Sequence, residues 1–152
     1  MSSAIRFTGE AQEVALAEAQ AVRAMASDDS YRERLAALVG AATEGEVAED
    51  DAATLEEVLE LGLQSGRIRA LYGPGGEQAA LTLYRKLPRG SELVQSAREV
   101  TDALRALEGR ALGAIELKAV GPGAFTLSVT AGELELSVRL DRQGARLSSV
   151  GI

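Results

Sequence analysis

The hydrophobic pattern of this 152-residue chain changes its period near residue 110. Before that point apolar residues recur every three or four positions, which predicts amphipathic helices, and after it they alternate with polar residues, which predicts strands with one covered face. The chain is therefore expected to adopt an α+β fold. In this fold N-terminal helices precede a C-terminal four-stranded antiparallel β-meander that is covered on one face by helices.

The N-terminal part of the pattern predicts a helical hairpin. Helical spacing runs over residues 10–26 and again over residues 30–42, and a polar stretch interrupts it between them. Ser30 and Glu33 match a capping box at the start of the second helix. We expect residues 1–46 to form this hairpin.

A linker and further helices are expected next. Residues 43–53 are acidic and small, which is typical of a linker, and Thr54 with Glu57 matches another capping box. The segment 67–72 alternates loosely and is compatible with a short strand. Helical spacing then continues to about residue 108, within an α+β domain predicted to span residues 47–152.

The β-meander is predicted over residues 112–150. Strands of alternating polarity are separated by short Gly-containing turns near residues 121–123, 131–132 and 141–144. Because turns this short join antiparallel neighbours, the four strands should follow one another in chain order.

Composition excludes several kinds of chemistry. The chain has no histidine and no cysteine, so imidazole bases, thiolate nucleophiles and disulfides are absent. No serine lies in a G-x-S-x-G elbow, and an acidic cluster over residues 44–51 does not match calcium-loop spacing. We predict no catalytic residue, no metal site and no cofactor, although a buried carboxylate acting as a base would leave no trace in the sequence.

Charge and composition also limit the expected partners. The net charge is −7 and aromatic residues make up 3% of the chain, which disfavours nucleic acid as a partner. No apolar stretch is long enough for a transmembrane helix, and the N-terminus lacks the features of a signal peptide, so we expect no membrane partner and a cytoplasmic location. The preference for Arg over Lys, together with abundant Ala and Gly, suggests a bacterial source.

A Gly-rich segment is the one candidate for anion binding. Glycines before a helix can let an anion approach backbone N–H groups, and two arginines lie just upstream. The candidate residues are Arg67, Arg69, Gly73, Gly75 and Gly76. The spacing fits neither common phosphate-binding motif, so a turn that uses glycine for its backbone freedom is the alternative.

A second candidate site is an apolar pocket between the sheet and the helices. Two tyrosines near the Gly-rich segment and five apolar strand residues would line it. These residues are Tyr72, Tyr84, Phe125, Leu127, Val129, Leu136 and Val138. The alternative is that the covered face of the sheet is simply filled core.

The C-terminal pattern resembles part of a known fold. A helix followed by a meander that ends in Leu140-Asp141-Arg142-Gln143-Gly144-Ala145-Arg146-Leu147 is similar to the end of an NTF2-like domain. This resemblance covers less than half of the chain and implies a sheet curled around an apolar cone. It carries no catalytic residue over, because the Asp–His pair common in NTF2-like enzymes has no counterpart here.

Two functions are compatible with the sequence. The first is a non-catalytic cytoplasmic protein that acts through protein–protein interaction or self-assembly. Its partner would be another protein or further copies of itself, in a homo-oligomer. The alternative is a small apolar-ligand binding protein, or a cofactor-independent enzyme, with an NTF2-like pocket.

Overall fold

The computed structural model of the protein describes residues 3–151 and divides into two compact units. One unit ends at Ser91 and the other begins at Glu92. The sequence-based boundary between residues 46 and 47 falls inside the first unit. The division into separately folding domains therefore stays a prediction.

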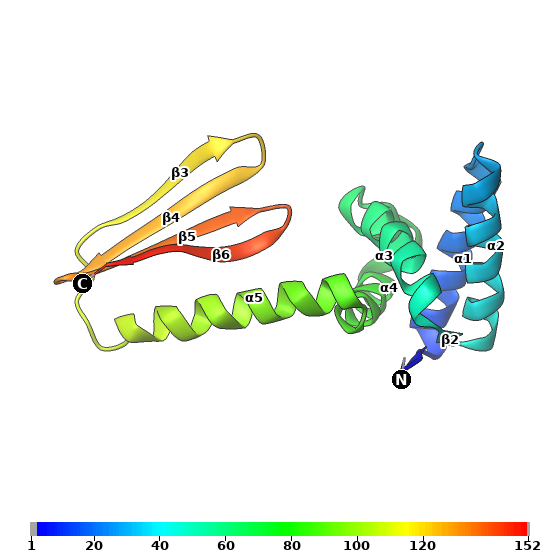
Figure 1. The fold of residues 1–152 in the computed structure, drawn as a ribbon, viewed down its shortest axis with the longest axis horizontal. Coiled ribbons are helices and arrows are strands. Elements are labelled where there is room, and N and C mark those ends of the chain that lie inside the picture. Colours follow the sequence, from blue (N-terminus) through cyan, green and yellow to red (C-terminus); the bar gives the residue numbers. More distant parts are fainter. Residues whose placement is uncertain (1–2, 152) are drawn as a thin grey trace. The chain divides into compact units, whose positions relative to one another are not determined.

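The first unit is mainly helical. Helices α1 and α2 lie side by side, and both pack against α3 (Figure 1). The elements of this unit are β1 (Ile5–Arg6), α1 (Gly9–Met25), α2 (Asp29–Glu44), β2 (Glu46–Val47), α3 (Glu49–Gln64) and α4 (Arg67–Lys86).

The expected linker over residues 43–53 is ordered secondary structure. Helix α2 ends at Glu44 and is capped by Gly45, which has a φ of 74°, and a Cβ at Gly45 would lie 2.8 Å from the Phe7 carbonyl oxygen. Strand β2 then pairs with β1, and the Val47 side chain is fully buried. The linker prediction was wrong because this one apolar residue anchors a two-residue strand, which is too short to give a periodic signal.

Two helix starts also differ from the sequence expectations. The cap of α2 is Asp28, whose carboxylate accepts a hydrogen bond from the Tyr31 N–H at 2.8 Å. Helix α3 begins at Glu49, so the capping box predicted at Thr54 lies inside the helix. The acidic residues at the start of α3 favour this earlier start, because negative charge is stabilised near a helix N-terminus.

The segment compatible with a strand is helical. Residues 67–72 form the first part of α4, with the Ile68 side chain fully buried against Gly62 of α3. The turn predicted at Gly73–Gly76 is a kink at one residue, since only Gly73 leaves the helical region, with φ 73° and ψ −175°. Pro74 follows directly, where its missing N–H costs little because a new helical segment begins there.

The core of the first unit is aliphatic, as the composition requires. Its largest fully buried apolar side chains come from all four helices and from the segments that join them. They are Val14, Leu35, Leu38, Val47, Leu55, Val58, Leu59, Ile68, Leu83 and Leu87.

The second unit contains the predicted β-meander. The strand order is β3-β4-β5-β6, and every neighbouring pair is antiparallel (Figure 1). Helix α5 (Pro88–Leu104) begins in the first unit and continues into the second, where a 3₁₀ turn (Arg105–Leu107) follows it. The strands are β3 (Ile115–Gly121), β4 (Ala124–Ala131), β5 (Leu134–Asp141) and β6 (Gly144–Gly151).

The sheet has one apolar and one polar face, and α5 contacts it. The register aligns Leu127 with Val138 and Val129 with Leu136 on the apolar face. A Cβ at Gly144 of β6 would lie 2.7 Å from a methyl carbon of Leu93 in α5. The predicted α+β fold, with helices followed by a meander and a helix on the sheet, is therefore confirmed.

Candidate functional site

Both arginines of the predicted anion site pair with carboxylates of the protein. Arg67 Nε donates to the two carboxylate oxygens of Glu18 at 3.2 and 3.1 Å, and the Glu18 side chain is almost completely buried. Arg69 Nη1 lies 3.1 Å from Glu77 Oε1 in an exposed pair. The two guanidinium groups thus already have anionic partners.

The glycines of this candidate site also face a carboxylate. A Cβ at Gly75 would lie 3.4 Å from Glu10 Oε1, and one at Gly76 would lie 3.6 Å from the same oxygen. Glu10 belongs to α1, so the start of the second segment of α4 has a negative charge from the same chain beside it. Anion binding at Gly73–Gly76 stays a prediction, and an incoming anion would meet Glu10 there.

The hydroxyl groups of the two candidate tyrosines are also bound to carboxylates, one buried and one partly exposed. Tyr72 Oη donates to Glu18 Oε1 at 3.0 Å, and Tyr84 Oη donates to Glu60 Oε1 at 2.7 Å. Burial raises the pKa of both phenols, and the hydrogen bond to each carboxylate raises it further. At neutral pH both hydroxyl groups are therefore protonated donors, not bases.

A second polar cluster surrounds Glu60. Arg89 Nε lies 3.1 Å from Glu60 Oε1, while the Arg89 backbone N–H donates to Glu56 Oε1 at 3.0 Å. Among the described residues, no buried side-chain nitrogen or oxygen lacks a hydrogen-bond partner. These carboxylates were not singled out in the sequence, because each one lies within an ordinary helical pattern and its partner is distant along the chain.

The five apolar strand residues of the predicted pocket divide into two groups. Val129, Leu136 and Val138 are buried in the second unit, whereas Leu127 is half-buried and Phe125 is exposed. The two tyrosines lie in the first unit. The buried strand residues therefore show that the centre of the sheet's apolar face is filled core. A pocket lined by all seven residues stays a prediction.

Apolar side chains are exposed toward the two edges of the same face. Ile115 and Leu117 on β3 are 60% and 59% exposed, and Val150 on β6 is 57% exposed. Ile115 is aligned with buried Val129, and Val150 with buried Leu136, so these exposed residues extend the apolar face outward from its covered centre. Burying such area in a contact with another molecule would be favourable.

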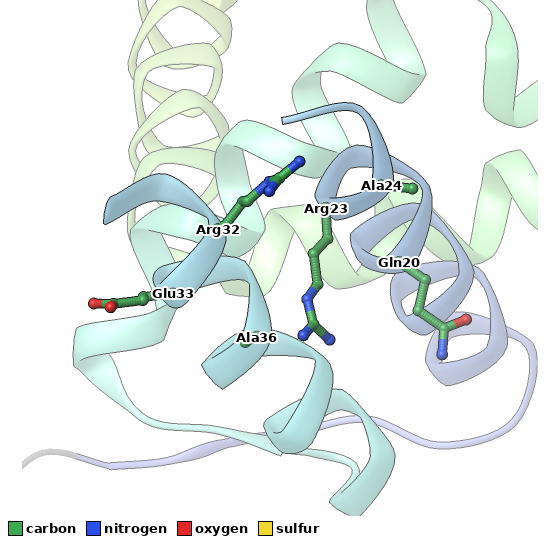
Figure 2. Close-up of a pocket in the computed structure, with 6 residues that line it drawn as sticks. All are labelled: Gln20, Arg23, Ala24, Arg32, Glu33 and Ala36. Atoms are coloured by element: carbon green, nitrogen blue, oxygen red, sulfur yellow. The ribbon is translucent and has the colours of Figure 1, made fainter. Parts of the chain in front are cut away.

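Surface hollows occur in the described part of the first unit, and two of them are well defined. The one shown in Figure 2 has a volume of about 490 Å³ between α1 and α2, and it is lined by Arg23 and Arg32, whose side chains point in different directions. The other, of about 590 Å³, lies between the N-terminal segment and α4 and includes Phe7, Glu10 and Lys86. Neither brings together groups with evident acid–base or nucleophilic chemistry.

Neither a cluster of metal-ligating side chains nor a membrane-spanning helix is found within residues 3–151. No group of three or more carboxylates in this range is arranged to hold a metal ion. No helix in the same range is long and apolar enough to cross a bilayer.

Comparison with known proteins gives no further assignment. No family model matches the chain, and neither a curated protein nor a solved structure shows significant similarity to it. The candidate site therefore depends on the geometry alone, and the exposed apolar part of the sheet is its most distinctive feature.

Proposed function

We propose that this protein is non-catalytic and acts through protein–protein contacts, either with itself or with another protein. The observation that carries the proposal is the pair Ile115 and Leu117, two large apolar side chains on one strand that are each more than half exposed. We call these two residues the β3 patch. The cytoplasm remains the proposed location and bacteria the proposed source, both on the sequence expectation alone.

The chemistry of the buried polar groups supports a non-catalytic role. The two candidate-site tyrosines, Tyr72 and Tyr84, are bound to the carboxylates of Glu18 and Glu60, and these carboxylates also pair with arginines, so the groups act as structural links between helices. A general base needs a free lone pair within reach of substrate. Glu18 already accepts hydrogen bonds from Arg67 and Tyr72.

Native mass spectrometry of the full chain, isolated from expressing cells without denaturant, tests the proposal. We expect the protein in assemblies heavier than its chain mass of 15.9 kDa. A variant with Ile115→Ser and Leu117→Ser should lose most of that assembled fraction. The matched control is Leu71→Ser, which removes an apolar side chain of similar exposure (58%) from the helical unit.

The same spectra can overturn the proposal. If the wild type and both variants all appear at the mass of one chain with nothing added, protein contact through the β3 patch is excluded. If a small extra mass is present and disappears on denaturation, the alternative of a small apolar-ligand binding protein or cofactor-independent enzyme replaces it.

A further inference from the structure

Within residues 3–151, strand β3 forms an edge of the sheet that no other strand pairs with. It is the first strand in the order β3-β4-β5-β6 and is exposed along its whole length. Edge strands present unsatisfied N–H and C=O groups that can pair with another strand. The question is which groups β3 offers and which strand they fit.

The hydrogen bonds to β4 show which backbone groups of β3 are free. The Thr130 N–H donates to the Ala114 carbonyl at 2.9 Å, and these two residues directly flank the aligned pair Ile115 and Val129. In an antiparallel pair the hydrogen-bonded positions alternate, so Glu116 and Lys118 also bond to β4. The N–H and C=O groups of Ile115, Leu117 and Ala119 therefore point to the open edge.

We propose that this edge pairs with β3 of a second copy of the chain, antiparallel and in a register centred on Leu117. The inference rests on the proposed function and names its partner. In this register Leu117 faces its own counterpart, and Ile115 faces Ala119 of the second copy. Ile115, Leu117 and Ala119 are the residues whose backbone N–H and C=O groups point to the open edge. Each of these facing pairs can therefore form two backbone hydrogen bonds.

The side chains of β3 are self-complementary in this register. On the polar face, Glu116 of each copy lies opposite Lys118 of the other, and opposite charges at paired positions stabilise a sheet. Within one chain these two groups lie 3.6 Å apart on an exposed surface. On the other face, the β3 patches of the two copies meet at the two-fold axis, so the apolar face continues from one sheet into the next.

The opposite edge is less suited to pairing. Strand β6 has a register shift where Ser137 pairs with Ser149 and Val138 pairs with Leu147, which leaves Ser148 as an extra residue. Such a bulge bends a strand and interrupts its hydrogen-bonding edge. The shift in β3 lies at its end, between Ala119 and Gly121, and leaves the preceding residues in regular register.

Charge variants of the full-length protein test the register. Sedimentation equilibrium across the micromolar range should give twice the 15.9 kDa chain mass for the wild type. Glu116→Lys alone, or Lys118→Glu alone, places like charges opposite each other twice in a symmetric dimer and should weaken it by about tenfold. The double variant, which swaps the two charges, should dimerise like the wild type.

A mixture of the two single variants gives a sharper readout. Glu116→Lys and Lys118→Glu chains are complementary to each other at both positions, so mixing them should restore a heterodimer that neither forms well alone. Leu117→Pro should abolish association, because proline removes an N–H from the open edge without removing a bond to β4. Circular dichroism of each variant checks that its fold is retained.

Three results would overturn the inference. A single-chain mass for the wild type at every concentration means that Glu116 and Lys118 protect the edge from pairing. A dimer that is indifferent to the charge variants and to Leu117→Pro uses another surface. Failure of the mixture to associate excludes this register. None of these three results overturns the proposed function if native mass spectrometry shows a different protein bound to the wild type and lost from the Ile115→Ser, Leu117→Ser variant.

Discussion

The two units of the molecule treat their apolar residues differently. The helical unit buries large aliphatic side chains almost completely, including Leu38, Leu55 and Leu59 at 0% exposure. The sheet unit fully buries only a small core around Leu136 and Val138, and it leaves Leu117 more than half exposed. A surface hydrophobic residue is common by itself, but a row that extends a buried face marks a place where another molecule fits.

The units also differ in how they hold charge. In the helical unit the buried carboxylates of Glu18 and Glu56 each accept a hydrogen bond from a residue of another helix. In the sheet unit the ion pairs Lys118–Glu116 and Arg139–Asp141 each have a largely exposed basic partner. Carboxylates thus link helices inside the helical unit, whereas the sheet unit keeps the basic groups of these pairs in contact with solvent.

The largest expected difference between the units comes from the same substitution at two leucines. Leu59→Ala leaves a cavity in the helical core and should cost about 2–5 kcal/mol of unfolding free energy. Leu117→Ala removes an exposed side chain and should change the stability of the monomer by less than about 0.5 kcal/mol. Urea unfolding followed by circular dichroism, at concentrations below those of any assembly, measures both. Equal losses of unfolding free energy would show that Leu117 is as buried as Leu59, and the difference between the two units in apolar burial would not hold.

The second prediction concerns the buried charge of the helical unit. Glu18→Gln replaces a carboxylate that accepts from Arg67 and Tyr72 with an amide that has one acceptor oxygen. We expect a loss of about 1–3 kcal/mol, limited because the Arg67 side chain is partly exposed and can be hydrated. The matched control is Glu13→Gln, an exposed position on the same helix, which should have no measurable effect. Similar stabilities for the two variants would mean that the buried pair contributes nothing.

The sheet was easier to predict from the sequence than the helical unit. Strands β4 and β5 follow directly from strict alternation and from turns with glycine, so their positions and pairing were confirmed. Residues 67–72 have a short pattern that fits strand or helix equally. Their helical state is decided by packing, because Ile68 is buried against Gly62 of another helix.

The candidate sites were harder to predict because they depend on distant contacts. Glu18 and Arg67 are 49 positions apart, and nothing in the local pattern of either residue shows that they meet. The sequence pattern does not predict the exposure of Ile115 either. Alternation identifies the apolar face of the sheet, but it does not show how much of that face a helix covers. Only the structure shows which apolar residues of that face remain uncovered.

The third prediction is that the helical unit weakens at alkaline pH. Burial first, and then the hydrogen bond to Glu60, raise the pKa of Tyr84 far above its ordinary value of 10.0. Above pH 10 the unfolded chain loses this proton while the folded chain keeps it, so stability falls as pH rises, by at most about 1.4 kcal/mol per pH unit for one group. Tyr84→Phe should reduce that slope, and unfolding by urea at several alkaline pH values measures it.

Absorbance at the tyrosinate band gives a direct check of this prediction. The chain has three tyrosines and no tryptophan, so the titration of the phenols is free of indole absorbance. The step that titrates last should disappear in Tyr84→Phe and remain in Tyr31→Phe. If Tyr84 titrates at its ordinary pKa in the folded protein, the link to Glu60 does not exist in solution.

The smallest expected effect is at acidic pH and belongs to the sheet unit. Arg139 beside Asp141, followed by the Gln143 N–H and Arg146, lowers the pKa of the Asp141 carboxyl below its ordinary 3.8. The ionised Asp141 carboxylate therefore stabilises the folded state fully above the ordinary pKa of 3.8. This stabilisation is lost as the pH falls through the lower pKa of the folded state, because the unfolded chain takes up the proton first. Since Asp141 joins both arginines at the β5–β6 turn, Asp141→Asn should affect amide exchange mainly in this hairpin. The protection factors of these amides, which are the intrinsic exchange rates divided by the rates measured by NMR at the same pH, should then differ between pH 3 and pH 6 in the wild type and stay nearly constant in the variant. A pH effect that survives the substitution, or one centred on the helices, would show that the acid response of the chain does not arise at this turn.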